Sequence, residues 1–76
     1  MNNIIVYSKK GCSACERVKA FLNSNNVEYS VMNVGEDITI EDFISETNSM
    51  SVPVTKIGDE LIIGFSMLKL KNKLNL

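Results

Sequence analysis

The stretch KKGCSAC, residues 9–15, contains both cysteines of the 76-residue chain, and the chain has no histidine. Two cysteines separated by two residues can bind a metal ion, form a structural disulfide or exchange electrons with another disulfide. The structural elements that hold the two sulfur atoms distinguish these roles.

A metal site has few ligands to draw on. Structural zinc takes four ligands from Cys, His or carboxylate, whereas the motif supplies two thiolates and no imidazole. A closed zinc site within one copy is therefore not expected. Cu(I) needs only two thiolates, so a copper carrier stays open as an alternative. Against it, heavy-metal-associated domains usually have Met where this chain has Lys10, and they end on a strand.

A structural disulfide is the other simple interpretation. A bridge between residues three apart closes so short a loop that it stabilises the fold by only about 2 kcal/mol in the chain-entropy model. In a reducing compartment, a close pair of cysteines is more often catalytic or metal-binding than structural.

The residues on either side of the pair predict a strand followed by a helix. Residues 4–7 are an unbroken β-branched and aromatic run, which is typical of a short strand buried on both faces. Gly11 then allows a turn. Apolar residues recur at helical spacing up to about Asn25: Ala14, Val18, Phe21 and Leu22. The helix is therefore predicted to begin at or beside Cys12.

The rest of the chain continues this alternation. Residues 27–34 alternate apolar and polar side chains and predict a second strand. Thr39 is a candidate cap of a helix that ends by Asn48, and Ser66 is a candidate cap of a final helix. Between these helices, SVPVTKI and ELIIGF flank the turn at residues 58–59 and predict an antiparallel hairpin. The predicted order is βαβαββα.

That order predicts an α/β fold. A strand–helix–strand unit nearly always forms a right-handed crossover between parallel strands, and the later hairpin adds antiparallel partners. We expect a mixed four-stranded sheet covered by helices, in a single domain over residues 1–76. A CxxC motif directly after the first strand of such an order is typical of the thioredoxin-like arrangement.

The predicted helix gives the two sulfurs different roles. A thiolate at a helix N-terminus faces unpaired backbone N–H groups and the positive end of the helix dipole, which lower its pKa. A thiol of pKa about 8.5 is only about 3% ionised at pH 7, whereas one of pKa about 7 is half ionised. We therefore predict that Cys12 attacks a substrate disulfide and that Cys15, one helical turn further, resolves the mixed disulfide.

Over nearly its whole length the chain resembles the glutaredoxins. VYSKKGCSAC resembles the family's V-Y-S-K-P-x-C-x-x-C, SVPVTKIG its T-V-P-x-V-F-I-G, and IIGFSML its G-G-F-D-D-L. The resemblance implies a thioredoxin-like fold of glutaredoxin type, with a cis peptide bond before Pro53. It also implies an enzyme, a thiol–disulfide oxidoreductase.

The resemblance further implies a set of substrate-binding residues: Tyr7, Lys9, Val52, Pro53, Gly64, Phe65 and Ser66. Val52 would pair through its backbone with glutathione or a peptide. Lys9 would meet a substrate carboxylate or steady the thiolate, and the N–H groups of Phe65 and Ser66 would take the other carboxylate. Several also have a purely structural interpretation: Tyr7 as core, Lys9 as a solvated charge, Val52 as a strand residue, Pro53 as a strand stop and Gly64 as a tight bend.

Three departures from the family pattern fall within its glutathione-binding part. Lys10 replaces the usual Pro, Ala14 replaces a frequent aromatic, and Ser66 with Met67 replaces an acidic pair. The chain also resembles small glutaredoxin-like proteins that reduce ribonucleotide reductase and accept electrons from thioredoxin reductase. These proteins often carry Gly-Phe at the position of residues 64–65.

The predicted function is a small dithiol–disulfide oxidoreductase that reduces protein disulfides, with ribonucleotide reductase as an expected electron acceptor. Glutathione or thioredoxin reductase would restore the dithiol. No bound cofactor or metal is expected, and glutathione is the candidate co-substrate. The alternative is a metal-binding module: a glutaredoxin dimer that bridges an iron–sulfur cluster, or a copper carrier.

Charge and hydropathy limit the other partners. The net charge of −1 and a single lysine cluster, Lys69, Lys71 and Lys73, give no broad basic surface for nucleic acid. No apolar run is long enough for a signal-peptide core or a membrane span. We therefore expect a monomeric cytoplasmic protein without nucleic-acid or membrane partners.

Overall fold

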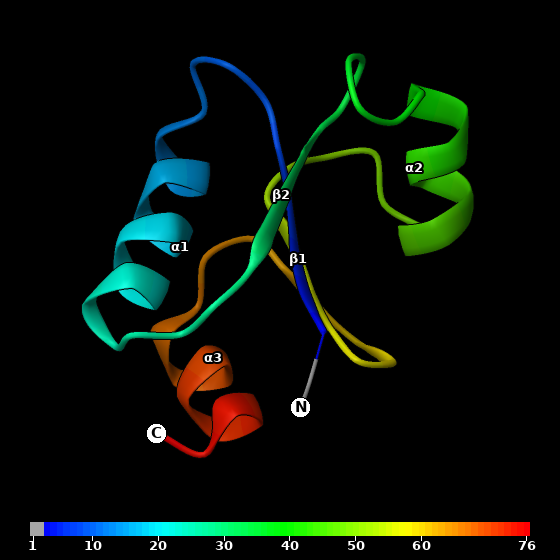
Figure 1. Cartoon of the computed structure of the whole chain (residues 1–76). Coiled ribbons are helices and arrows are strands. Elements are labelled where there is room, and N and C mark those ends of the chain that lie inside the picture. Colours follow the sequence, from blue (N-terminus) through cyan, green and yellow to red (C-terminus); the bar gives the residue numbers. More distant parts are fainter. Residues whose placement is uncertain (1–2) are drawn as a thin grey trace.

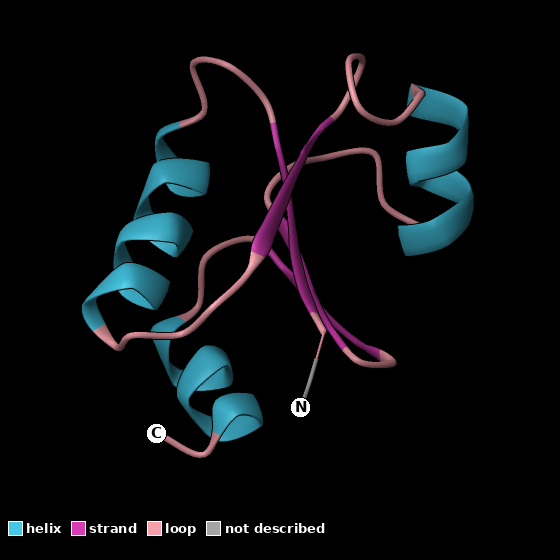
Figure 2. Ribbon diagram, viewed as in Figure 1, coloured by secondary structure: helices cyan, strands magenta, loops and turns pink. Residues whose placement is uncertain are grey.

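The computed structural model describes residues 3–76, and within them the elements follow the predicted order βαβαββα. The sheet is mixed, with strand order β2-β1-β3-β4. Helices α1 and α3 lie on one side of the sheet and α2 lies on the other (Figures 1 and 2). The bounds are β1 (Ile4–Ser8), α1 (Ser13–Ser24), β2 (Ser30–Asn33), α2 (Ile40–Thr47), β3 (Val54–Ile57), β4 (Glu60–Ile63) and α3 (Met67–Leu74).

Strand β1 lies in the interior of the sheet. It runs parallel to β2 and antiparallel to β3, and β3 pairs antiparallel with β4 through the hairpin. Because β1 has a strand on each side and helices on both faces, its run of apolar residues is almost entirely buried. The predicted parallel crossover and antiparallel hairpin are both confirmed.

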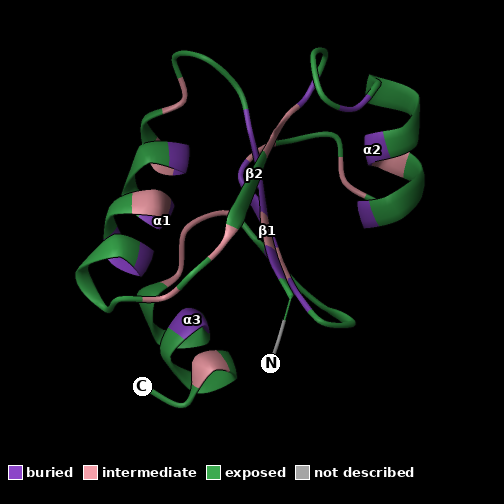
Figure 3. Cartoon of the chain, in the orientation of Figure 1, coloured by how far each residue is buried: buried purple, intermediate pink, exposed green. Residues whose placement is uncertain are grey.

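Two apolar clusters pack on the two faces of the sheet (Figure 3). We call the first the α1-face core; its buried members are Ile4, Val6, Val18, Phe21, Leu22, Ile57, Ile62 and Leu70. We call the second the α2-face core; its buried members are Tyr7, Val34, Ile38, Phe43 and Val54. Successive residues of β1 alternate between the two cores, as the pleat requires.

The second strand is shorter than its sequence pattern predicts. Residues 27–29 do not belong to β2, which begins at Ser30. The Val27 N–H donates to Leu22 O at 3.0 Å, and the Tyr29 hydroxyl donates to Asn23 Oδ1 at 3.1 Å. These residues therefore close the C-terminal end of α1 and pack against the α1-face core instead of pairing with β1.

The predicted caps of the later helices are present. Thr39 Oγ1 accepts a hydrogen bond from the Asp42 N–H at 3.1 Å, and Ser66 Oγ accepts one from the Lys69 N–H at 3.3 Å. Each bond satisfies an N–H group that has no partner within the helix. No helix of residues 3–76 is long and apolar enough to cross a membrane.

Candidate redox-active site

Cys12 is the N-cap of α1. The chain turns at Gly11, whose φ of +76° lies in the left-handed region, and Cys12 itself is extended with φ −94° and ψ 104°. In this conformation Cys12 Sγ accepts a hydrogen bond from the Cys15 N–H at 3.1 Å. The sulfur thus occupies the position that a capping oxygen normally takes, at the positive end of the helix.

The two sulfurs differ in their access to solvent. Cys12 is partly exposed, whereas Cys15 is completely buried within the first turn of α1. A disulfide links them. A large disulfide substrate can therefore approach only the Cys12 side of the pair.

The loop before β3 lies against Cys12. The peptide bond between Val52 and Pro53 is cis, and Val52 O is 4.0 Å from Cys12 Sγ. The Gly64 N–H donates to Pro53 O at 2.8 Å, which fixes the end of β4 beside the same loop. In this way Cys12 and Val52, which are 40 positions apart in the sequence, lie beside each other.

Phe65 and Ser66 continue from this point into α3. Phe65 is half-buried and packs against the α1-face core, while Ser66 caps the helix. Lys9 is exposed. Lys10 Nζ lies 3.9 Å from Glu36 Oε1, but the Lys10 side chain is 94% exposed, so this ion pair is worth little.

Tyr7 is not brought to the site. Its side chain is completely buried in the α2-face core, with its ring centroid 5.3 Å from that of Phe43. Its hydroxyl donates to Glu46 Oε1 at 3.3 Å. Burial, reinforced by the negative charge of Glu46, raises the pKa of Tyr7 above its usual 10.0. Tyr7 therefore lies on the face of the sheet opposite α1 and its two cysteines.

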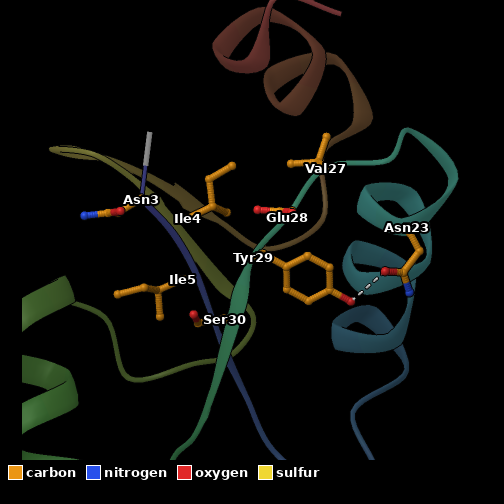
Figure 4. A pocket seen from close by; sticks show the side chains of 8 residues that line it. All are labelled: Asn3, Ile4, Ile5, Asn23, Val27, Glu28, Tyr29 and Ser30. Atoms are coloured by element: carbon orange, nitrogen blue, oxygen red, sulfur yellow. Dashed lines mark hydrogen bonds between the residues drawn. The ribbon is translucent and has the colours of Figure 1, made fainter. Parts of the chain in front are cut away.

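Two hollows in the surface lie away from the cysteine pair. The larger, about 860 Å³, is lined by residues from β1, the end of α1 and the segment before β2 (Figure 4): Asn3, Ile4, Ile5, Asn23, Val27, Glu28, Tyr29 and Ser30. The smaller, about 350 Å³, lies between β2 and α2. Neither contains a residue that the sequence assigned to the site.

Within residues 3–76, no group of three or more His, Cys, Asp or Glu side chains is placed to hold a metal ion. The described part of the chain therefore offers no ready-made metal centre around the cysteine pair.

Two relevant side chains escape sequence reasoning. Glu46 accepts a hydrogen bond from the Tyr7 hydroxyl, which is 39 positions away in the sequence. No sequence pattern relates the two residues. Thr55 lies in the hairpin segment and is fully buried, with its hydroxyl oxygen unpaired among the described residues. The available signal for Thr55 is a polar residue between Pro53 and Ile57, the apolar residues that share its side of the strand.

The sheet is mixed and has helices on both faces, and a cis-proline loop lies against a partly exposed N-cap cysteine. These features define a thioredoxin-like dithiol protein. The glutaredoxin family model matches residues 4–62. The chain belongs to the glutaredoxin family, which confirms the resemblance and the fold that it implied.

Relatives agree with this membership. The chain is 40% identical over 57 residues to an N-acetyl-S-hydroxy-L-cysteine reductase of Bacillus subtilis, a match that covers 74% of this chain but only 61% of the reductase. It is 33% identical over 64 residues to a glutaredoxin-like 8.6 kDa protein in the rubredoxin operon of Clostridium pasteurianum, covering 83% and 85% of the two chains. The glutaredoxin of Archaeoglobus fulgidus superposes with a TM-score of 0.84 at 28% identity, covering 100% and 89%.

Proposed function

We propose that the protein is a dithiol–disulfide oxidoreductase in which Cys12 attacks and Cys15 resolves. The observation that carries this proposal is the difference in exposure: Cys12 is partly exposed at the helix N-cap, and Cys15 is buried one turn further. The attacking sulfur must reach a substrate, whereas the resolving sulfur needs to reach only Cys12.

The cycle has two exchange steps. The Cys12 thiolate attacks one sulfur of a substrate disulfide; a Cys12–substrate disulfide forms, and the other substrate sulfur leaves as a thiolate that takes a proton from water. Cys15, after losing its proton to solvent, then attacks Cys12 Sγ. The Cys12–Cys15 disulfide forms and the second substrate thiolate leaves, so the substrate gains two electrons and the protein loses two.

The loop before β3 is the proposed docking point. The Val52 carbonyl lies 4.0 Å from Cys12 Sγ, and the Gly64 N–H donates a hydrogen bond to Pro53 O. An extended substrate segment can add its backbone to Val52 in the manner of a short strand. We assign Lys9, Phe65 and Ser66 to the binding of substrate carboxylates, the last two through their N–H groups at the start of α3.

The preferred electron acceptor is a protein disulfide, and ribonucleotide reductase is our first candidate, in a reducing cytoplasm. The Bacillus relative is named for a substrate with an S-hydroxy sulfur. A sulfenic acid of that kind condenses with a thiol to give a disulfide and water, so the same Cys12 attack would accept it. Sulfenic acids are therefore the second substrate class to test.

The deciding experiment supplies the oxidised protein with one of two reducing systems. One contains glutathione, glutathione reductase and NADPH, and the other contains thioredoxin reductase and NADPH. NADPH consumption coupled to a protein disulfide shows which system recycles the dithiol. Because Lys10, Ala14 and Ser66 depart from the glutathione pattern, we expect faster recycling by thioredoxin reductase. Absence of NADPH consumption with both systems contradicts the proposal.

A further inference from the structure

We propose that the Thr55 hydroxyl donates a hydrogen bond to the Cys15 sulfur when the disulfide is reduced, and that it thereby assists resolution. This inference rests on the proposed function, because it assigns a helper to the resolving sulfur. Thr55 is a positioning residue in this scheme, acting through Cys15 and not on the substrate.

The starting observation is a buried hydroxyl with nothing to bond. Thr55 is 0% exposed, and within residues 3–76 its Oγ1 has no hydrogen-bond partner. Thr47, the comparable buried threonine, instead donates to Phe43 O at 2.8 Å. A buried polar group without a partner is destabilising, and such groups are rare enough in native proteins to call for a specific explanation.

The strand register places this hydroxyl on the same face as the redox helix. Thr55 is directly opposite Val6 of β1 and Ile62 of β4, and both partners belong to the α1-face core. Residues directly opposite each other in a sheet project to the same side. The Thr55 side chain therefore enters the layer between the sheet and α1.

Cys15 lies on α1, which covers that same side of the sheet (Figure 1). It is fully buried and precedes Val18, a member of the α1-face core, by three positions on α1. Thr55 follows Pro53 by two positions, and the neighbouring Val52 carbonyl is 4.0 Å from Cys12 Sγ. The unused donor and the buried sulfur therefore lie on the same side of the sheet, and Thr55 is near the end of β3 that begins beside the redox pair.

Reduction creates a need for such a donor. The oxidised Cys15 sulfur carries no charge, but resolution requires its thiolate. Cys15 is completely buried, and burial raises the pKa of a thiol. A hydroxyl that points into this layer can donate to the thiolate and offset part of that penalty.

The assisted step is the second exchange of the cycle. Cys15 loses its proton to solvent, Thr55 Oγ1 donates to the resulting thiolate, and Cys15 Sγ then attacks Cys12 Sγ. The Cys12–Cys15 bond forms and the bond from Cys12 to the substrate sulfur breaks. The substrate leaves as a thiolate that is protonated by water, and the Thr55 hydroxyl keeps its own proton throughout.

The test uses Thr55→Val, which removes the hydroxyl and keeps the shape, and Thr55→Ser, which keeps the hydroxyl. The reduced protein is mixed with 5,5′-dithiobis(2-nitrobenzoate) in stopped flow. The first chromophore released reports attack by Cys12, and the second reports resolution by Cys15. We expect the second phase of Thr55→Val to slow about tenfold with the first phase unchanged, and Thr55→Ser to retain most of the wild-type second-phase rate.

An equilibrium measurement supports the kinetic one. In glutathione redox buffers, loss of a bond made only in the reduced state should raise the constant for disulfide formation about three- to tenfold in Thr55→Val. Thr47→Val is the matched control, because it removes a buried hydroxyl from the α2 side of the molecule; it should leave both quantities unchanged.

Two results overturn the inference: wild-type kinetics and equilibrium in Thr55→Val, or equal shifts in Thr55→Ser and Thr55→Val, which would assign the effect to packing. Thr55→Val should fold, because it removes an unpaired hydroxyl from the core. Failure of the proposed function is a separate result, since it appears as no NADPH consumption by the wild-type protein whatever the Thr55 variants do.

Discussion

The N-termini of α1 and α2 share one capping geometry and differ in the capping atom. In α1, Cys12 Sγ accepts the N–H of the residue three positions on at 3.1 Å; in α2, Thr39 Oγ1 does the same at 3.1 Å. Both capping residues have extended backbones. In α2 the capped N–H group only stabilises the helix. The equivalent N–H group of α1 is directed at a sulfur that can carry charge and react.

The charges of the first turns follow the same division. The first turn of α2 carries Glu41 and Asp42, which complement the helix dipole. The first turn of α1 carries only Glu16, whose carboxylate lies 2.6 Å from Lys19 Nζ. The positive end of α1 is thus left largely available to a thiolate, whereas that of α2 is satisfied by fixed acids.

The largest effect should come from exchanging the capping atom of α1. Serine is a good N-cap, so Cys12→Ser should keep α1 capped and change stability by no more than about 1 kcal/mol relative to the reduced wild type. Its rate of disulfide reduction should fall to the uncatalysed background, because the nucleophile is gone. Coupled NADPH consumption and urea unfolding measure the two quantities. Thr39→Ser, a change at the N-cap of α2, is the control and should retain full turnover. An active Cys12→Ser protein would show that another group attacks.

Removing the buried sulfur should have a smaller and more selective effect. Cys15→Ser can still attack through Cys12 but cannot resolve, so a Cys12–substrate disulfide should accumulate and be visible by mass spectrometry. Reduction of protein disulfides should fall by about tenfold or more, while turnover that glutathione itself completes should persist. If no adduct accumulates, Cys15 is not the resolving residue.

The comparison of helix ends also shows what sequence could and could not predict. Cys12, Thr39 and Ser66 follow a local rule, a capping side chain before a helical pattern, so all three helix starts were predictable. For residues 27–29 the alternating pattern predicts a strand and is wrong, because contacts with the end of α1 override it.

Long-range contacts explain the remaining differences. The placement of Tyr7 in the α2-face core depends on Phe43 and Glu46, which the sequence does not link to it. The resemblance implies that Tyr7 binds substrate, with a place in the core as the alternative, and alternation along β1 sends its side chain into the α2-face core. The unpaired hydroxyl of Thr55 becomes visible only when the strand register and burial are known together.

Removing a cap oxygen should have effects of intermediate size. These effects should distinguish a helix that begins at the site from a helix that is only structural. Thr39→Ala and Ser66→Ala each remove one capping bond and should each lower the free energy of unfolding by about 1 kcal/mol. Only Ser66→Ala should also raise the KM for a carboxylate-bearing substrate such as glutathione, because loss of this cap loosens the start of α3, where the N–H groups of Phe65 and Ser66 are the proposed carboxylate donors. Equal effects of the two variants on KM would remove α3 from the site.

The smallest effect should come from Tyr7→Phe, and it tests whether the α2 face is separate from the redox face. Loss of the hydrogen bond to Glu46 should lower the free energy of unfolding by about 0.5 to 1 kcal/mol at pH 8, while disulfide turnover stays at the wild-type rate. A loss of turnover would place Tyr7 in the site after all.

The pH dependence of that difference follows from the raised pKa of Tyr7. Well below pH 10 the phenol is protonated in both folded and unfolded chains, so its contribution to stability is fully present. As the pH rises past the usual value of 10.0, the unfolded chain ionises first and binds fewer protons than the folded one. Stability then falls with pH. The wild type should therefore lose its advantage over Tyr7→Phe in urea unfolding as the pH rises from 10.0 through the raised pKa of folded Tyr7. Glu46→Gln removes the charge that helps to raise this pKa, so it should weaken the loss of stability at alkaline pH. If the stability difference between wild type and Tyr7→Phe is constant over this pH range, Tyr7 ionises alike in the folded and unfolded states.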